Sequence, residues 1–173
     1  PHRRIVLLGV KPGDRTGQVA AQLARTLAEQ GNTVRWEDLS PDASDALQTV
    51  TGGDPLEVEP VTDGNQARNR PVPVLTGTGE KVRGKASVVR SVRAGAGRIW
   101  LDAPADPDET MVTVVRAGAA ERDDRGVRAA LEAAAVLIVR QDQIKVAELD
   151  RLVGVLRLTG TRTLGVVLVS GHV

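Results

Sequence analysis

Short apolar runs alternate along this chain with segments in which apolar residues recur every three or four positions. Residues 5–8 form such a run and predict a strand covered on both faces. Residues 18–31 have helical spacing, and Gly31 stands where a helix ends in a left-handed residue. Between them, residues 9–17 contain a Pro-Gly turn signal and predict a loop. The chain therefore begins with a strand, a glycine-containing loop and a helix.

The same two patterns continue beyond this first unit. The runs that predict strands are residues 33–38, 99–101, 111–115, 135–139 and 163–169, of which the last two read as buried. The segments that predict helices are residues 42–50, 123–134 and 144–158. This alternation predicts an α/β fold, with a mostly parallel sheet and helices on both faces.

Residues 41–97 are the least regular part of the sequence. Gly, Pro, Asp and Asn accumulate over residues 51–79, which predicts loop. Basic residues gather there and just beyond, with Glu80 the only acid among them: Arg68, Arg70, Lys81, Arg83, Lys85, Arg90, Arg93 and Arg98. A solvated surface and an interaction surface for an anionic partner both explain this charge. We expect residues 1–173 to form one domain, with residues 41–97 as an irregular, basic insert or variable region.

Composition excludes several classes of site. The chain has no cysteine, so disulfides and thiolate metal sites are absent, and its two histidines are His2 and His172 near the ends. A net charge of +1 implies no general affinity for polyanions, and the near absence of aromatic residues argues against specific nucleic-acid binding. No apolar run reaches the ~20 residues of a membrane span. Because the sequence starts at Pro1, we expect a piece of a longer protein whose anchor, if any, lies outside it.

The strand–loop–helix unit at the start is the scaffold of a phosphate-binding loop, but its chemistry is missing. Such a loop, GxxxxGK[ST], needs a lysine on the phosphates and a hydroxyl on magnesium. No Gly-Lys-Ser/Thr occurs anywhere in this chain. The vestigial site predicted here consists of Lys11, Gly13, Asp14, Arg15, Thr16 and Gly17, together with Asp38.

Asp38 ends the second predicted strand. Open α/β sheets place ligand-handling groups at the carboxyl ends of their strands, which favours a functional aspartate. An acid in this position also commonly caps the turn or helix that follows. The sequence leaves both roles open.

The order of these pieces resembles the cytoplasmic ATPase domain of bacterial tyrosine kinases, the Wzc- and CapB-like proteins related to the MinD/ParA ATPases. The resemblance covers roughly the first 40 and last 75 residues. Residues 11–14 and 19–24 match the family's Pro-Gly loop and Ala-rich helix. Arg15 falls on a family glycine, Thr16 on the catalytic lysine and Gly17 on the magnesium-binding hydroxyl. Lys11 matches the second, signature lysine of the deviant loop.

The family's two acidic motifs are also altered. Asp38 falls on the first aspartate of the second motif and Ser40 on its second. The third motif fits residues 111–118 best, which puts Arg116 on its aspartate. In an alternative register it fits residues 100–104 and retains the aspartate as Asp102.

The resemblance implies a P-loop NTPase-like three-layer sandwich that has lost its catalytic groups. Because phosphoryl transfer depends on placed charges, we expect no turnover, no catalytic residue, no metal site and no cofactor. The chain also lacks the tyrosines that such kinases phosphorylate. The family setting implies a pseudo-ATPase or pseudokinase scaffold in surface-polysaccharide biosynthesis or export. It would lie in the cytoplasm as part of a membrane-anchored bacterial protein, contacting copies of itself and a membrane-embedded chain-length determinant segment.

Three other readings stay open. In the first, a divergent but active NTPase or tyrosine kinase binds ATP and Mg²⁺, with Lys11 or Arg15 replacing the lysine and Asp38 with Asp102 holding the metal. In the second, residues 68–98 bind an anionic partner, with an affinity that falls steeply as salt is added. In the third, the chain is an α/β domain whose loops only connect its elements.

Overall fold

The computed structural model describes residues 3–40, 48, 50–52, 56–60, 88–101 and 111–170. Its strands are β1 (Arg4–Gly9), β2 (Thr33–Asp38), β3 (Glu57–Pro60), β4 (Val88–Ala94), β5 (Gly97–Trp100), β6 (Val112–Ala119), β7 (Ala134–Arg140) and β8 (Arg162–Val169). The helices with described bounds are α1 (Thr16–Glu29), α3 (Arg125–Ala130) and α4 (Val146–Leu158).

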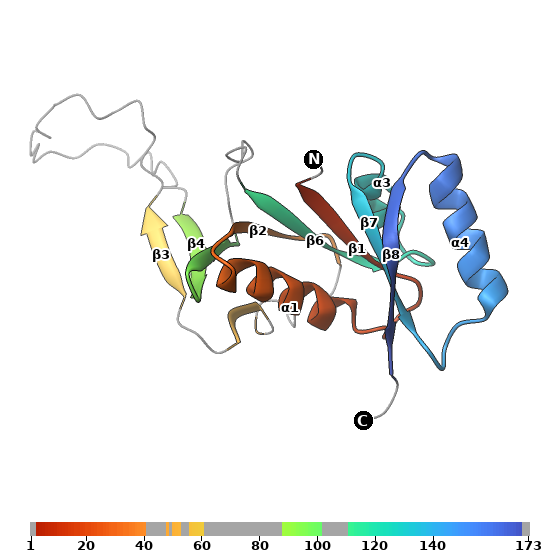
Figure 1. Ribbon diagram of the computed structural model, residues 1–173, viewed down its shortest axis with the longest axis horizontal. Coiled ribbons are helices and arrows are strands. Elements are labelled where there is room, and N and C mark those ends of the chain that lie inside the picture. The colour runs from red at the N-terminus through yellow and green to blue at the C-terminus, as the bar shows by residue number, and fades with distance from the viewer. Residues whose placement is uncertain are drawn as a thin grey trace, which may run out of the picture.

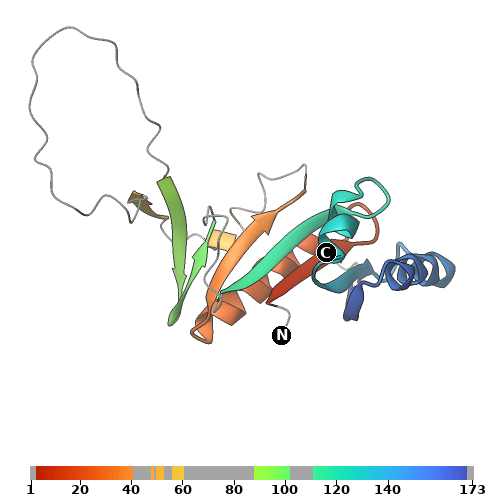
Figure 2. The ribbon, with the colours of Figure 1, turned by 90° about the horizontal axis from the view of Figure 1, so that it is seen from above.

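The strands form one eight-stranded sheet in the order β3-β4-β5-β2-β6-β1-β7-β8. From β5 to β8 every neighbouring pair is parallel, and only β3–β4 and β4–β5 are antiparallel. Helix α1 covers one face, whereas α3 and α4 pack on the other (Figures 1 and 2). The predicted α/β class, with a mostly parallel sheet between helical layers, is therefore confirmed.

Strand β1 divides the core between the two helical layers. Leu7 is 1% exposed and packs on the α1 side, where small alanines of that helix let it lie close to the sheet. Val6 and Leu8 are fully buried on the opposite side, against residues of α3 and α4. Burying each such aliphatic side chain contributes about 1.5–3 kcal/mol. These contacts fix β1, and with it the loop that follows.

Helix α1 ends as the sequence predicts. Gly31 adopts φ 89°, its N–H donates to the Ala28 carbonyl, and the Asn32 N–H donates to the Leu27 carbonyl. This pair of bonds is the Schellman motif, which needs the left-handed conformation that glycine adopts at least cost. The helix begins at Thr16, two residues before the predicted start at Gln18.

Three expectations about the elements are wrong. Residues 41–97 are not irregular throughout, because they contain β3 and β4, whose Arg, Glu and Pro content hid the strand pattern. The helix expected over residues 123–134 is shorter, since α3 ends at Ala130 and Ala134 begins β7. The strand expected over residues 163–169 exists, but it is an edge strand rather than a buried one.

Strand β8 exposes a row of apolar side chains at that edge. Leu164, Val166, Val167 and Leu168 are between 38% and 65% exposed. Figure 1 shows β8 lying between β7 and α4, with α4 at the end of the molecule. Among the described residues, no helix combines the length and apolar character needed to cross a membrane.

Candidate functional site

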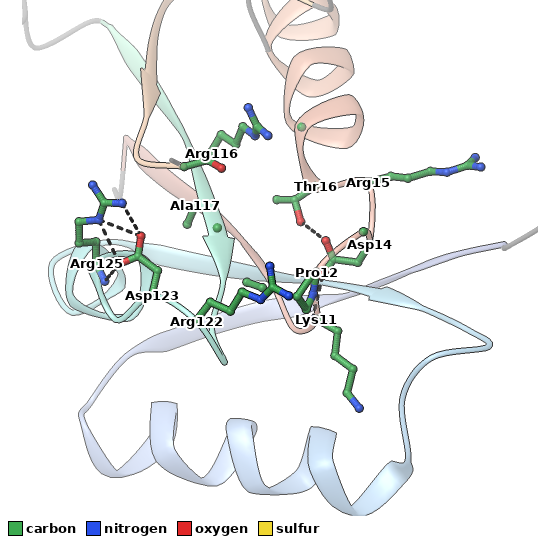
Figure 3. A pocket seen from close by; sticks show the side chains of 15 residues that line it. Lys11, Pro12, Asp14, Arg15, Thr16, Arg116, Ala117, Arg122, Asp123 and Arg125 are labelled. Carbon is green, nitrogen blue, oxygen red and sulfur yellow. Dashed lines mark hydrogen bonds and ion pairs between the residues drawn. The ribbon is translucent and has the colours of Figure 1, made fainter. Parts of the chain in front are cut away.

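The predicted loop opens onto a cavity of about 820 Å³ at the carboxyl ends of β1 and β6 (Figure 3). One wall is the loop itself, residues 11–17, and the opposite wall comes from residues 116–119 of β6 and the turn that follows. Parallel strands present their carboxyl ends at one edge of the sheet, and ligands commonly bind there. The structure thus brings together the predicted residues Lys11, Gly13, Asp14, Arg15, Thr16 and Gly17 around one cavity, while Asp38 lies beside it on β2.

Asp14 turns inward beneath the loop instead of facing the cavity. Its side chain is buried, with 4% exposure, and its Oδ1 accepts a hydrogen bond of 2.6 Å from the Thr16 hydroxyl. Its Oδ2 accepts a second bond of 3.1 Å from the Lys11 N–H. Burial raises the pKa of Asp14, and the Thr16 hydroxyl and nearby backbone N–H groups oppose that rise. A carboxylate of the chain therefore occupies the place below the loop where N–H groups converge.

The backbone around Asp14 is built to accept this arrangement. A Cβ on Gly9 would lie 2.6 Å from the Asp14 Oδ2 and 2.7 Å from the Thr16 Oγ1, so only glycine fits there. Arg15 adopts φ 59°, the left-handed conformation, which costs a non-glycine residue about 1–2 kcal/mol. Arg15 is the residue that replaces a glycine of the resembled loop, and its side chain points away from Arg116 across the loop (Figure 3).

Lys11 is held by α4. Its Nζ lies 2.8 Å from the Glu148 Oε2, and this hydrogen bond is the main cause that raises the pKa of Lys11 and lowers that of Glu148. Figure 3 shows the Lys11 side chain running toward α4 and away from Arg116 and Arg125. Lys11 is thus engaged by a carboxylate of its own chain.

Arg116 forms an ion pair with Asp38 across two neighbouring strands. The two residues are register partners at the ends of β6 and β2, and the Arg116 Nη1 lies 3.0 Å from the Asp38 Oδ2. Each side chain is only 13% exposed. The Asp38 Oδ1 also accepts a 2.9 Å bond from the Ser40 N–H, so Asp38 has the capping role that the sequence left open.

The residues present do not fit a magnesium ion. A Cβ on Gly17, the position that matches the metal-binding hydroxyl, would lie 3.1 Å from the Arg116 Nε. A guanidinium cation therefore occupies the space beside this position and engages the carboxylate that would face a metal. Among the described residues, no three His, Asp or Glu side chains gather as metal ligands. We assign no step to a metal here.

The opposite wall of the cavity contains residues that the sequence analysis did not single out. Arg125 donates from its Nε to Asp123 at 2.8 Å and its Nη2 lies 2.7 Å from the same carboxylate. This pairing is the main cause that lowers the pKa of Asp123. Arg122 lines the same wall. The sequence offered one indication of their role, since Arg122, Asp123 and Arg125 follow directly after β6, the strand that carries Arg116.

No family model matches this chain, and no curated protein matches its sequence.

Two of the open readings depend in part on residues outside the described part of the chain. Asp102, needed by the alternative register, lies there, as do Arg68, Arg70, Lys81, Arg83 and Lys85 of the basic segment. Of the described members, Arg93 and Arg98 both pair with Glu57, at 3.0 and 3.1 Å. Arg98 also lies over the Trp100 ring, 5.1 Å from its centroid. Part of the basic charge is therefore balanced within the sheet.

Proposed function

We propose that this chain is a catalytically inactive, phosphate-loop-like module that acts as a scaffold or regulatory interaction domain. The Arg116–Asp38 ion pair carries the proposal. Arg116 places a cation where the resemblance expects an acid that faces the metal. Asp38, the remaining acid, lies 3.0 Å from that cation and is neutralised by it. Magnesium in such a site is held by carboxylate and hydroxyl oxygens of the protein together with phosphate oxygens, and a positive charge in place of a carboxylate repels the ion.

The loop supports the same proposal. Thr16, at the position of the catalytic lysine, is 6% exposed and donates its hydroxyl to Asp14. Lys11, the remaining lysine of the loop, pairs with Glu148. Catalysis of phosphoryl transfer requires cations aimed at the transferred group, and neither side chain is aimed in that way.

A titration calorimetry experiment tests the proposal. We expect no binding of ATP in the presence of Mg²⁺ at micromolar protein, and no phosphate release above that of the buffer. Gly17→Ser, which restores the missing hydroxyl, should not create Mg²⁺-dependent binding, because the Arg116 guanidinium lies against that position. Micromolar, Mg²⁺-dependent binding by the unmodified chain would refute the proposal.

For the setting, we propose the cytosolic side of a surface-polysaccharide export or chain-length complex, on the strength of the sequence resemblance. We propose further that the domain contacts a second copy of itself, besides a membrane-embedded chain-length determinant segment. The exposed apolar edge of β8 supports self-contact, since an unpaired apolar edge strand is a template for another strand. Cross-linking in cells that express the full-length protein tests both contacts.

A further inference from the structure

The two edge strands of the described sheet differ in how well they are protected against pairing with another strand. At one edge, β3 is four residues long, and its sequence, EVEP, contains two glutamates and a proline. Short length, charge and proline are the usual means that keep an edge strand unpaired. At the other edge, β8 is eight residues long, and after Arg162 at its start it contains no charged residue and no proline. The outer edge of β8 is therefore suited to pairing with a further strand.

Apolar side chains project from both faces of β8. Val167 is the register partner of Ile138, which packs on the α1 side, and Val166 is the register partner of Leu137, which packs on the opposite side. Val167 is 38% exposed and Val166 is 42% exposed. Because a strand inside a sheet that is covered on both faces is apolar on both, a strand that pairs with β8 should have this composition too. β8 itself meets that requirement, so a second copy of the chain offers a matching strand.

Helix α4 has two flanks, one on each side of the residues that it packs against the sheet. The flank toward the loop lines a cavity of about 620 Å³, with Glu148, Arg151 and Val155 among the lining residues. The opposite flank carries a continuous stripe whose members follow one another at spacings of four, three and four residues. The stripe consists of Val146, Asp150, Val153 and Arg157.

The two charges of this stripe have no partner on their own helix. The positions three and four residues away from Asp150 and from Arg157 hold only Val, Ala, Gly or Thr. Both residues are exposed, and neither forms an ion pair with another residue of the described part of the chain. When two copies of the stripe lie antiparallel and cross near Val153, Asp150 of each copy lies opposite Arg157 of the other. The stripe is therefore complementary in charge to a second copy of itself.

We propose that two copies of this chain pair antiparallel along β8 across a two-fold axis, with their α4 helices side by side over the joint. A two-fold axis perpendicular to the sheet keeps both helices on the same face and makes each surface patch meet its own copy. The strand edges supply main-chain hydrogen bonds, while the two Asp150–Arg157 pairs select the antiparallel register. The inference deepens the self-contact of the proposed function, on which it rests, by assigning its surface and geometry.

Charge exchange on α4 tests this arrangement by sedimentation velocity of the whole chain, at low ionic strength and over a range of concentrations. We expect the unmodified chain to self-associate. Asp150→Arg and Arg157→Asp each place like charges opposite one another at two symmetric positions, so each should weaken association about tenfold. The variant with both exchanges restores opposite charges and should associate like the unmodified chain. An equimolar mixture of the two single variants should associate more tightly than either alone, because opposite charges then meet between unlike copies.

Arg151→Asp is the matched control, because Arg151 lies on the other flank of the same helix and should not affect association. The proposal is overturned if the unmodified chain stays monomeric at millimolar concentration, if Asp150→Arg associates like Arg151→Asp, or if the double exchange associates as weakly as the single ones. Association that ignores the exchanged charges removes this geometry alone, whereas absence of association also removes the self-contact of the proposed function. The inactive site is tested separately, by the titration with ATP and Mg²⁺.

Discussion

Arg116 and Asp38 lie 78 positions apart in the sequence, yet they form a hydrogen-bonded ion pair of 3.0 Å at the ends of adjacent parallel strands. Strand β6 lies between β1 and β2, which places Arg116 directly beside Asp38 and close to the first turn of α1. The pair thus joins the carboxyl ends of β2 and β6 beside the first turn of α1. Its effect is structural as well as electrostatic, because it links two neighbouring strands at the edge of the sheet that borders the cavity.

Removal of one member of this pair should destabilise the fold. Arg116→Ala leaves the Asp38 carboxylate largely buried without its cation, so we expect the free energy of unfolding to fall by about 3 kcal/mol. The double variant Asp38→Asn with Arg116→Met should recover much of this loss, because no uncompensated charge remains. Urea denaturation of Arg116→Ala, of the double variant and of its component variants Asp38→Asn and Arg116→Met measures both effects. Strictly additive losses would contradict the coupling of the two side chains.

The close approach of Asp14 to Gly9 gives a second stability prediction. Gly9→Ala places a Cβ within 2.6 Å of the Asp14 Oδ2, so the carboxylate must move and we expect a loss of about 2 kcal/mol. Gly154→Ala in α4 is the matched control, because nothing lies within 4 Å of its added Cβ. That change should stabilise by about 0.5–1 kcal/mol, the usual gain of alanine over glycine within a helix. Thermal melts that show equal shifts for the two variants would contradict the packing of Asp14.

Asp14 should also give the stability a specific pH dependence. Burial raises its pKa in the folded state, so the folded chain holds this proton more tightly than the unfolded chain does. Its contribution to stability is therefore greatest below the ordinary aspartate pKa and falls as the pH rises through the raised value. Relative to Asp14→Asn, the unmodified chain should lose stability over that interval.

Denaturant titrations of the two proteins at several acidic and neutral pH values measure this difference. Comparison with the variant removes the opposite contributions of Asp123 and Glu148, whose pKa values are lowered. A difference of the opposite sign would mean that the loop stabilises the Asp14 carboxylate more than burial destabilises it.

The sequence predicts the elements of this fold better than their environment. Periodicity places β1, β2 and α1 nearly where they lie, because each is an uninterrupted run of one pattern. It fails for β3 and β4, where polar residues such as Glu57 and Arg93, which pair with each other, replace the apolar alternation of a strand. It also predicts β8 as buried, because an apolar run looks the same at the edge of a sheet as at its centre.

The site shows the same division. The sequence predicts the loop after β1 and shows an arginine, Arg116, in the strand β6. The two meet at one edge of the sheet because β1 and β6 are parallel neighbours. The inward turn of Asp14 does not, because it depends on a missing Cβ at Gly9 and on the Thr16 hydroxyl, which only coordinates reveal. Arg122 was overlooked since it belongs to no recognisable motif and gains its meaning from the cavity that it lines.

The exposed edge of β8 leads to a prediction about assembly. Leu168 is 65% exposed on a strand whose outer edge has no neighbouring strand within the described sheet. If a second copy pairs along this edge, a charge at Leu168 opposes burial of that strand in the interface. Leu168→Lys should therefore lower the apparent molecular mass in sedimentation velocity at high protein concentration.

Leu131→Lys provides the control for this experiment, because Leu131 is 47% exposed at the end of α3, outside the β8 edge. It should associate like the unmodified chain. Both variants alter an exposed leucine, so their folding should be similar, and circular dichroism verifies it. If the unmodified chain sediments as a monomer at every concentration, or if both variants dissociate equally, self-contact through β8 is wrong.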